Sequence, residues 1–389
     1  MAYSSDIRQA VGAVRQTLEA IGIGRQGERM RQHGKHEPDP HAPLVLVACS
    51  GGRDSLALAS VAAMVCGMLG VRCGAVIVDH ALIAGSATVA EHAAQQCRSF
   101  GMAPVEVRRV IVKNSGAGIE ADARAARYRE LLAVCRDLQG SAVLLAHTKD
   151  DQAETVMMGL LRTVGLDALA GMPMVRQIEG VTFARPLLEL SRQQTTAICR
   201  EQGIDWWDDP TNGTGSSADE GGLSTDLPLR SRIRNALLPY LGNLSETDVI
   251  THLSRSAVVA QRDKDYLDTQ AAKVMEESVV LVDDLACHGS RHDGHDNPVE
   301  TQQSGDVTIC RARLSVTRLA GEHAAIRTRV IARTLVRAGV SASSKQVDAI
   351  DALITDWHGQ GAVALPSSHS AIRKGQVIHI CHYGVHANL

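Results

Sequence analysis

The sequence predicts an α/β fold, a doubly wound parallel sheet followed by a smaller, mostly helical C-terminal domain. Short apolar runs alternate with helical patterns through the first half of the chain, as in parallel sheets whose faces are covered by helices. A Gly-rich turn joins the first apolar run to a helix, and helical patterns dominate the C-terminal part. These three observations together favour two domains of different architecture.

Size and composition agree with this prediction. A chain of 389 residues holds two or three domains. Hydrophobic residues make up 44% of the chain but aromatic residues only 3%, so aliphatic side chains must build the core. The net charge of −3 gives no overall attraction for a polyanion, so a nucleic-acid partner would need a local basic patch.

The N-terminal elements can be predicted in order. Apolar positions in 7–18 follow a helical spacing, and a polar stretch, 25–43, separates this helix from the first strand. Leu44–Cys49 is apolar on both faces, which is typical of a buried parallel strand. Apolar residues resume at Leu56 with helical spacing. We therefore expect an N-terminal helix and linker over 1–42, and a strand–turn–helix unit after it.

The alternation continues along the chain. Further strands are expected at 75–80, 105–112 and 142–147, and helices at 88–100, at 118–135 and from Asp151 onward. Four polar residues fall at strand carboxyl ends, namely Ser50, Asp79, His80 and His147. Ligands of doubly wound sheets bind beyond these ends, so the side chains should meet in one crevice.

The remainder of the chain divides by composition. Residues 211–227 are rich in Gly, Ser, Asp and Thr and predict a flexible loop. Helical patterns cover 245–278 and 321–357, and short strands are expected within 362–380. The expected domains are a catalytic domain over 43–212, a flexible loop and basic connector over 213–243, and a mostly helical domain over 244–389.

The turn after the first strand is suited to hold an anion. Its residues are Ser50, Gly51, Gly52, Arg53, Asp54 and Ser55. Two glycines allow a tight turn and a close approach of backbone to ligand, and the helix start adds free N–H groups. It is not a Walker A loop, because no Gly-Lys-Ser/Thr follows. The alternative is an ordinary Gly-rich turn.

Two helix starts carry further candidate residues. Asp151 and Glu154 share a helix face, where they could hold an amine or Mg²⁺, or be acids that favour a first helical turn. Glu120 and Arg124 are four residues apart, which fits a surface salt bridge or a guanidinium that faces phosphate.

Basic residues follow the expected flexible loop. Alternate arginines, Arg230, Arg232 and Arg234, suit a polyanion or a nucleotide phosphate. Just before this loop, Trp206 or Trp207 could stack on a base, although a buried tryptophan is the simpler interpretation.

The SGGRDS turn resembles the SGGxDS loop of PP-loop ATP pyrophosphatases, whose fold is adenine nucleotide α-hydrolase-like. The order of motifs, SGGRDS, VDH, GIEADARAARY, LAHTKDDQAET, RPLL, DDPTN and RSRIR, resembles the tRNA(Ile)-lysidine synthase family over residues 44–241. This resemblance implies that ATP adenylates the wobble cytidine of tRNA(Ile) with a CAU anticodon. Free L-lysine then displaces AMP and forms lysidine.

The resemblance also implies roles for single residues. Residues 50–55 would bind ATP, and Asp54 would help to hold Mg²⁺. The catalytic residues would be Asp54, Arg124 and His147. Lysine would be recognised by Glu120, Asp151 and Glu154, and the nucleotide would lie near Arg230, Arg232 and Arg234.

Some positions depart from the family pattern. Ala81 stands where Gly often follows VDH, Thr163-Val164 replaces a Gly-Ser-like pair, and 213–227 resembles an insertion. These departures put the local loop shapes in doubt. The nearest rival, a cytidine thiolase of the same superfamily, is expected to need paired CxxC cysteines, and none of the nine cysteines forms such a pair. The alternative from another functional class is a non-catalytic tRNA-binding protein that retains an inactive loop. The intact SGGRDS sequence argues against this alternative.

The expected setting is a reduced cytoplasm, because the cysteines are scattered and neither a signal pattern nor a long apolar run occurs. The expected partners are tRNA and free lysine, with no membrane, and the oligomeric state is left open. Arg329, Arg333 and Arg337 share a helix face that would dock tRNA or be merely solvated.

Three other patterns are read as non-functional. The GxGxxG string over 22–27 follows a helix rather than a strand. The histidines of 288–295 fit a polar loop better than a metal site. His379, His382 and His386 are expected to form a surface tail.

Overall fold

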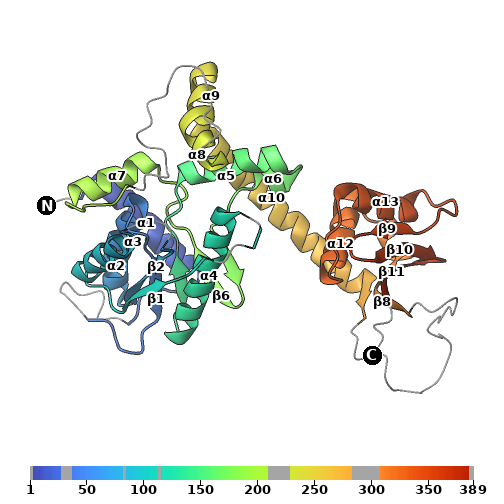
Figure 1. The fold of residues 1–389 in the computed structure, drawn as a ribbon, viewed down its shortest axis with the longest axis horizontal. Helices are drawn as coiled ribbons and strands as arrows, with labels where there is room; N and C mark the ends of the chain where they lie inside the picture. Colours follow the sequence, from blue (N-terminus) through green and yellow to red (C-terminus); the bar gives the residue numbers. More distant parts are fainter. Residues whose placement is uncertain are drawn as a thin grey trace. The chain divides into compact units, whose positions relative to one another are not determined.

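The computed structural model describes residues 3–27, 37–81, 85–112, 115–116, 118–208, 228–282 and 307–384. The chain divides into two compact units, residues 1–261 and 262–389 (Figure 1). The expected boundaries of the functional domains remain a prediction, because much of the expected loop and connector lies outside the described residues.

A six-stranded sheet forms the centre of the first unit. Its strands are β1 (Leu44–Ala48), β2 (Arg72–Asp79), β3 (Val105–Arg109), β4 (Ala142–Leu144), β5 (Val175–Ile178) and β6 (Val181–Ala184), in the spatial order β3-β2-β1-β4-β6-β5. All neighbours pair in parallel except β5 and β6. The prediction of a doubly wound, mostly parallel sheet is confirmed.

The described helices before residue 228 are α1 (Ser5–Ala20), α2 (Arg53–Leu69), α3 (Ser86–Ser99), α4 (Ile119–Asp137), α5 (Lys149–Arg162), α6 (Leu166–Leu169) and α7 (Arg192–Glu201). Helices α2 and α3 pack on one face of the sheet and α4 on the other, while α1 and α7 pack against α2. Val45 and Val47 of β1 pack in the cluster formed with α1, α2, α3 and α7, whereas Leu46 packs with α4 on the other face. This alternation explains why β1 is apolar at every position.

Further helices follow residue 228. They are α8 (Leu229–Arg232), the π-helical turn η3 (Ile233–Leu237), α9 (Leu238–Ser245) and α10 (Val249–Ser278). Within the described residues, no helix is both long and apolar enough to cross a membrane.

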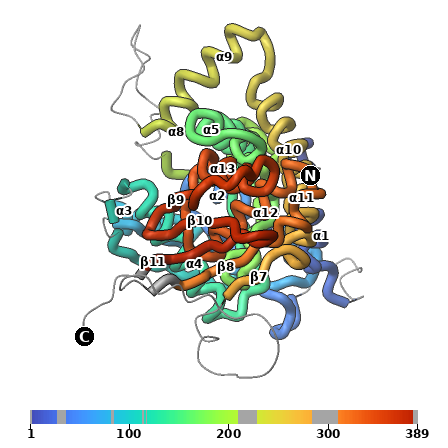
Figure 2. Tube along the Cα trace, turned by 90° about the vertical axis from the view of Figure 1, so that its right-hand side faces the viewer, coloured from blue at the N-terminus to red at the C-terminus, as the bar shows by residue number. Residues whose placement is uncertain are grey.

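The second unit combines helices with an antiparallel sheet. Its strands are β7 (Val279–Leu281), β8 (Val307–Ser315), β9 (Val363–Leu365), β10 (His369–Lys374) and β11 (Val377–Gly384), in the order β7-β8-β11-β10-β9 (Figure 2). The helices α11 (Val316–Ala320), α12 (Ala324–Arg337) and α13 (Ser344–Thr355) share one core with it. A smaller C-terminal domain is present, as predicted. Its sheet has five strands and begins well before residues 362–380, where short strands were expected.

The structure corrects one prediction in this sheet. His379 and His382, expected in a surface tail, lie within β11 and pair with β8 and β10. The two histidines are three positions apart, so they follow no strict period of two, and the strand was not recognisable without its partners β8 and β10. His386 lies outside the described residues, as do the histidines of 288–295.

Two elements of the first unit were not anticipated. The β5–β6 hairpin turns at Glu179 and Gly180, which have φ of 46° and 82°. Its strands are only four residues long, too short for a periodicity signal. Helix α7 begins with a capping box between Ser191 and Gln194, a signal that sequence reasoning could have used.

Candidate active site

A cavity of about 880 Å³ lies at the carboxyl ends of the parallel strands of the first unit. Thirteen predicted or strand-end residues line it: Ser50, Gly52, Arg53, Asp54, Ser55, Asp79, His80, Glu120, Arg124, His147, Asp151, Arg230 and Arg234. Its volume is in the range of sites for ligands of nucleotide size. Among the predicted site residues, Gly51, Glu154 and Arg232 lie outside this lining.

The Gly-rich turn forms one wall. The Ser55 hydroxyl accepts a hydrogen bond from the Ser50 backbone N–H at 3.1 Å and donates to the Gly52 carbonyl at 2.8 Å. Helix α2 starts at Arg53 without a side-chain cap. Its first N–H groups therefore stay available at the cavity wall, as an anion site requires.

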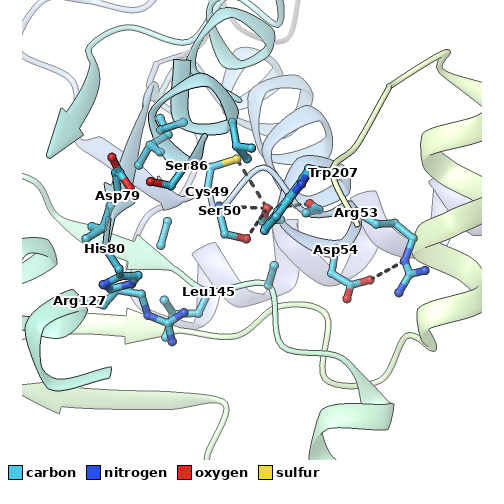
Figure 3. A pocket seen from close by; sticks show the side chains of 18 of the residues that line it. Cys49, Ser50, Arg53, Asp54, Asp79, His80, Ser86, Arg127, Leu145 and Trp207 are labelled. Carbon is cyan, nitrogen blue, oxygen red and sulfur yellow. Dashed lines mark hydrogen bonds and ion pairs between the residues drawn. The ribbon is translucent and has the colours of Figure 1, made fainter. Parts of the chain in front are cut away.

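Gly51 is the position in this turn where glycine is required. Its φ is +80°, and a Cβ would lie 3.3 Å from the Cβ of Ala93. The Gly51 carbonyl accepts a hydrogen bond from the Trp207 backbone N–H at 3.0 Å. Trp207 also lines the cavity beside Ser50 (Figure 3), whereas Trp206 donates from Nε1 to Asp208 at 3.1 Å. Both tryptophans are half-buried, so Trp207 remains a candidate for contact with a base.

Asp54 faces the cavity from the first turn of α2. Its Oδ1 accepts a hydrogen bond from the Thr195 hydroxyl, and its Oδ2 lies 3.7 Å from Nε of Arg192. Burial raises the pKa of Asp54, and the hydrogen bond from Thr195 opposes this shift. Mg²⁺ on nucleotides is commonly held by one or two carboxylates together with phosphates, so this partly exposed carboxylate fits that role.

Three guanidinium groups surround the acid pair. The Glu154 side chain is fully buried and meets Nε of Arg234 at 2.6 Å, Nε of Arg230 at 2.7 Å and Nη2 of Arg192 at 3.2 Å. Asp151 Oδ1 lies 3.1 Å from Arg230 and 3.2 Å from Arg192. Glu154 therefore holds three arginines from behind the cavity, and Asp151 contacts the same groups from its wall.

These contacts keep both acids ionised. Burial favours the neutral acid, but Arg192 and Arg230 outweigh it and lower the pKa of Asp151 to about 2. Burial opposes ionisation of Glu154 as well, yet the hydrogen bond from Arg234 gives it a lowered pKa. The acids in turn outweigh burial and raise the pKa of Arg192.

We expect Glu154→Gln to destabilise the protein by about 3 kcal/mol, because breaking a buried ion pair leaves charge uncompensated. Urea unfolding at neutral pH measures this. The pKa of Glu154 is lowered in the fold, so its contribution is present above the unfolded value of about 4.3 and is lost as the pH falls. The matched control is Glu19→Gln, which breaks an exposed pair with Arg15 and should cost under about 1 kcal/mol. Equal losses in the two variants would contradict the prediction.

A second group of cations lies around Tyr128 of α4. The guanidinium of Arg124 lies 5.1 Å from the ring centre of Tyr128, and that of Arg127 lies 5.9 Å away. Arg185 is buried and donates to the Pro173 carbonyl at 2.8 Å. Burial, followed by the neighbouring Arg124, lowers the pKa of Arg127. Arg124 and Arg127 line the cavity and are suited to meet an anion there.

The two cavity histidines are kept neutral. Burial lowers the pKa of His147 to about 3, with Arg185 and Arg127 acting in the same direction against Asp151. Burial, followed by Arg127, also lowers the pKa of His80. The buried Nδ1 of each histidine has no hydrogen-bond partner among the described residues. A neutral imidazole with an unused ring nitrogen can accept or donate a hydrogen bond.

Sequence reasoning missed Arg192 and Arg127 as site residues. Arg127 lies in the same helical motif as Arg124, one turn further on, and this spacing could have revealed it. Arg192 follows a helix N-cap on α7 and has no motif of its own. Its contact with Asp54, Asp151 and Glu154 arises only from packing of α7 against α2 and α5.

The turn after β2 accommodates Ala81 at the position where the family pattern often has glycine. Ala81 has φ of +52°, a conformation that glycine adopts more easily, and its N–H donates to Asp79 Oδ1 at 2.9 Å. The turn after β2 therefore forms with alanine at some conformational cost.

Three features of the site define a PP-loop nucleotide-binding enzyme. A helix starts without a side-chain cap after the first parallel strand, no Walker lysine follows it, and carboxylates lie at the end of a neighbouring strand. A family model described as a PP-loop domain matches residues 27–241, and one described as a TilS substrate binding domain matches residues 314–378. The chain belongs to the tRNA(Ile)-lysidine synthase family.

Relatives support this membership across the whole chain. The tRNA(Ile)-lysidine synthase of Bifidobacterium longum subsp. infantis is 52% identical over 100% of both chains. That of Salinispora tropica is 40% identical over 87% of this chain and 90% of its own. That of Streptomyces coelicolor is 37% identical over 86% of this chain and 84% of its own.

Proposed function

We propose that this enzyme attaches L-lysine to C2 of the wobble cytidine of tRNA(Ile) with a CAU anticodon, forming lysidine, AMP and pyrophosphate. The observation that carries the proposal is that the PP-loop turn and Asp151 line the same cavity. Nucleotide and amine can therefore react within one cavity. The expected compartment remains the cytoplasm, where ATP and tRNA are available.

The first step would use the wall formed by the PP-loop turn. The cytidine O2 attacks the α-phosphorus of ATP, and the bond to the β-phosphate oxygen breaks to release pyrophosphate. The N–H groups at the start of α2 would bind the phosphates, and Arg124 and Arg127 would offset the charge that develops. Mg²⁺, held by Asp54, would supply further neutralisation of phosphate charge.

The second step would use the wall around Asp151. The lysine amine attacks C2 of the adenylated cytidine, and AMP leaves. Asp151 and Glu120 of α4 line the cavity and are the proposed partners of lysine ammonium groups. Glu154, also expected to recognise lysine, is buried behind the cavity and would act through the arginines that it holds. Asp151 and Glu154 already carry arginines, so an ammonium must share or displace a guanidinium. His147 is neutral and is suited to accept a hydrogen bond from the amine.

Mass analysis of tRNA tests the proposal. After incubation of the enzyme with tRNA(Ile), ATP and lysine, the wobble nucleoside should gain the mass of lysine less one water. ATP–pyrophosphate exchange that depends on tRNA would separate an enzyme from a tRNA-binding protein. A product that gains sulfur, or no product with a competent tRNA, would refute the proposal.

The C-terminal unit offers a face for tRNA. Arg329 and Arg333 of α12 lie 3.5 Å and 3.2 Å from Asp268 Oδ1 on α10, so one carboxylate offsets two cations. Arg337 lies one turn further along α12. The face therefore keeps positive charge that could meet tRNA phosphates.

We expect the triple change Arg329→Gln, Arg333→Gln and Arg337→Gln to weaken tRNA binding. Neutralisation is preferable to reversal, because glutamates would face Asp268. The slope of log Kd against log salt should fall by about 2 to 3, since fewer counterions are released. Titrations at several salt concentrations measure this, with Lys345→Gln on α13 as the control. An unchanged slope would place tRNA elsewhere, and ATP affinity should not change.

A further inference from the structure

The second unit carries a cysteine pair that the proposed reaction does not use. Cys310 of β8 and Cys381 of β11 are directly opposite each other in the antiparallel register. Opposite Cα atoms in antiparallel strands lie about 4.5 to 5.5 Å apart. A disulfide spans Cα distances of about 4.4 to 6.8 Å. The backbone therefore holds the pair at a spacing that a disulfide can bridge.

The pair lies on the sheet face away from the helical core. Ala312 and Ile380, the preceding partners in the register, are fully buried in that core. A register shift separates Ile380 from Cys381, where the ladder is irregular. Cys381 is 8% exposed, and Cys310 is half-buried. A small oxidant can therefore approach Cys310 from the solvent side.

A histidine and an arginine lie near Cys310. Its Sγ is 3.9 Å from Nδ1 of His379, and His379 is opposite Arg313 across the two strands. His379 and Cys381 are two positions apart on β11 and so share a face. A hydrogen bond from Cys381, aided by His379 and Arg313 and opposed by burial, lowers the pKa of Cys310 to about 5.

The two thiols are therefore unequal. The contact with Cys310 and burial raise the pKa of Cys381, while Lys374 of β10 slightly opposes this. The contact between them therefore favours ionisation of Cys310 over that of Cys381. A partly accessible, more acidic thiol beside a second thiol is the arrangement of a reactive cysteine with a resolving partner.

We propose that Cys310 is a peroxide-reactive cysteine and that Cys381 resolves its oxidised form as a reversible disulfide within the C-terminal unit. The Cys310 thiolate attacks one oxygen of hydrogen peroxide, the O–O bond breaks, and with one proton the products are a sulfenic acid and water. The Cys381 thiol then attacks the Cys310 sulfur and releases a second water. Two thiols are oxidised by two electrons, and one peroxide is reduced. This site is independent of the proposed tRNA reaction.

The chain contains a matched internal comparison. Cys73 of β2 is also half-buried and contacts Cys66 of α2. There the contact with Cys66, followed by burial, raises the pKa of Cys73. Cys73 should therefore react slowly, although it has a neighbouring thiol.

The experiment oxidises the reduced full-length protein with a small excess of hydrogen peroxide and maps the products by peptide mass spectrometry. The expected product is a peptide pair joined through Cys310 and Cys381, two hydrogens lighter than the reduced peptides and restored by dithiothreitol. In Cys381→Ser, dimedone should instead trap a sulfenic acid at Cys310. Iodoacetamide at pH 6 should label Cys310 at least about 10-fold faster than Cys73, after allowance for the lower nucleophilicity of a low-pKa thiolate.

Two histidine variants isolate the role of His379. His379→Gln should slow peroxide reaction at Cys310 and move the pH midpoint of its alkylation upward. His382→Gln is the control, because His382 packs against the His369 ring, with 4.6 Å between the ring centres. Labelling of Cys310 no faster than Cys73, or oxidation that joins Cys310 to another cysteine, would overturn the proposal. Equal rates in the two histidine variants would also overturn it, and circular dichroism confirms that each is folded.

Discussion

Asp54→Ala should reduce tRNA-dependent ATP–pyrophosphate exchange by at least about 100-fold while the protein stays folded. Asp54 of the PP-loop turn lines the cavity and is the carboxylate placed to hold a phosphate-bound cation. Loss of one preorganised charge-stabilising group commonly costs about 10²- to 10³-fold in rate. The measurement is exchange of labelled pyrophosphate into ATP with saturating tRNA(Ile).

The control for this change is Glu91→Ala. Glu91 is an exposed acid on α3 that pairs with Arg98 at 3.0 Å and lies outside the cavity lining. Its removal should leave exchange unchanged. Near-normal exchange in a folded Asp54→Ala protein would remove Asp54 from the catalytic site. Asp54→Asn separates loss of charge from loss of the hydrogen bond that Thr195 donates.

Asp151→Asn should raise the lysine KM by about 30-fold or more and spare adenylation of tRNA. An ammonium that binds in a desolvated site depends on its carboxylate partners, and loss of one costs about 2 to 5 kcal/mol. Asp151 lines the cavity, whereas Glu154 is buried behind it, so Asp151 is the cleaner test. Lysine transfer is measured at varied lysine, and adenylation is measured without it.

The outcome separates two roles for the acid. Equal loss of adenylation and lysine transfer would show that Asp151 serves the nucleotide, for instance by orienting Arg192 and Arg230. The control, Asp137→Asn, removes an exposed acid at the end of α4 outside the cavity. Assays should be run well below the unfolding midpoint, because the variant also loses buried ion pairs.

The candidate site illustrates how far residue patterns reach. SGGRDS predicted both the turn and the cavity wall, because glycine geometry and helix N–H groups are local properties. The placement of Glu154 was not predictable. A helix-start acid can face solvent, ligand or cation equally well in sequence, and here it packs beneath three arginines from α7, α8 and η3.

By itself, the sequence determined the order of the first four strands and of the helices between them, the PP-loop turn and the convergence of polar residues at strand ends. These follow from local periodicity and from the geometry of parallel sheets. Only the tertiary structure decided the Asp151–Glu154–arginine cluster, the placement of Arg192 and the β8–β11 pairing that joins Cys310 to Cys381. Each of these depends on contacts between residues tens of positions apart. Such contacts are set by packing and strand register, which no local pattern in the chain encodes.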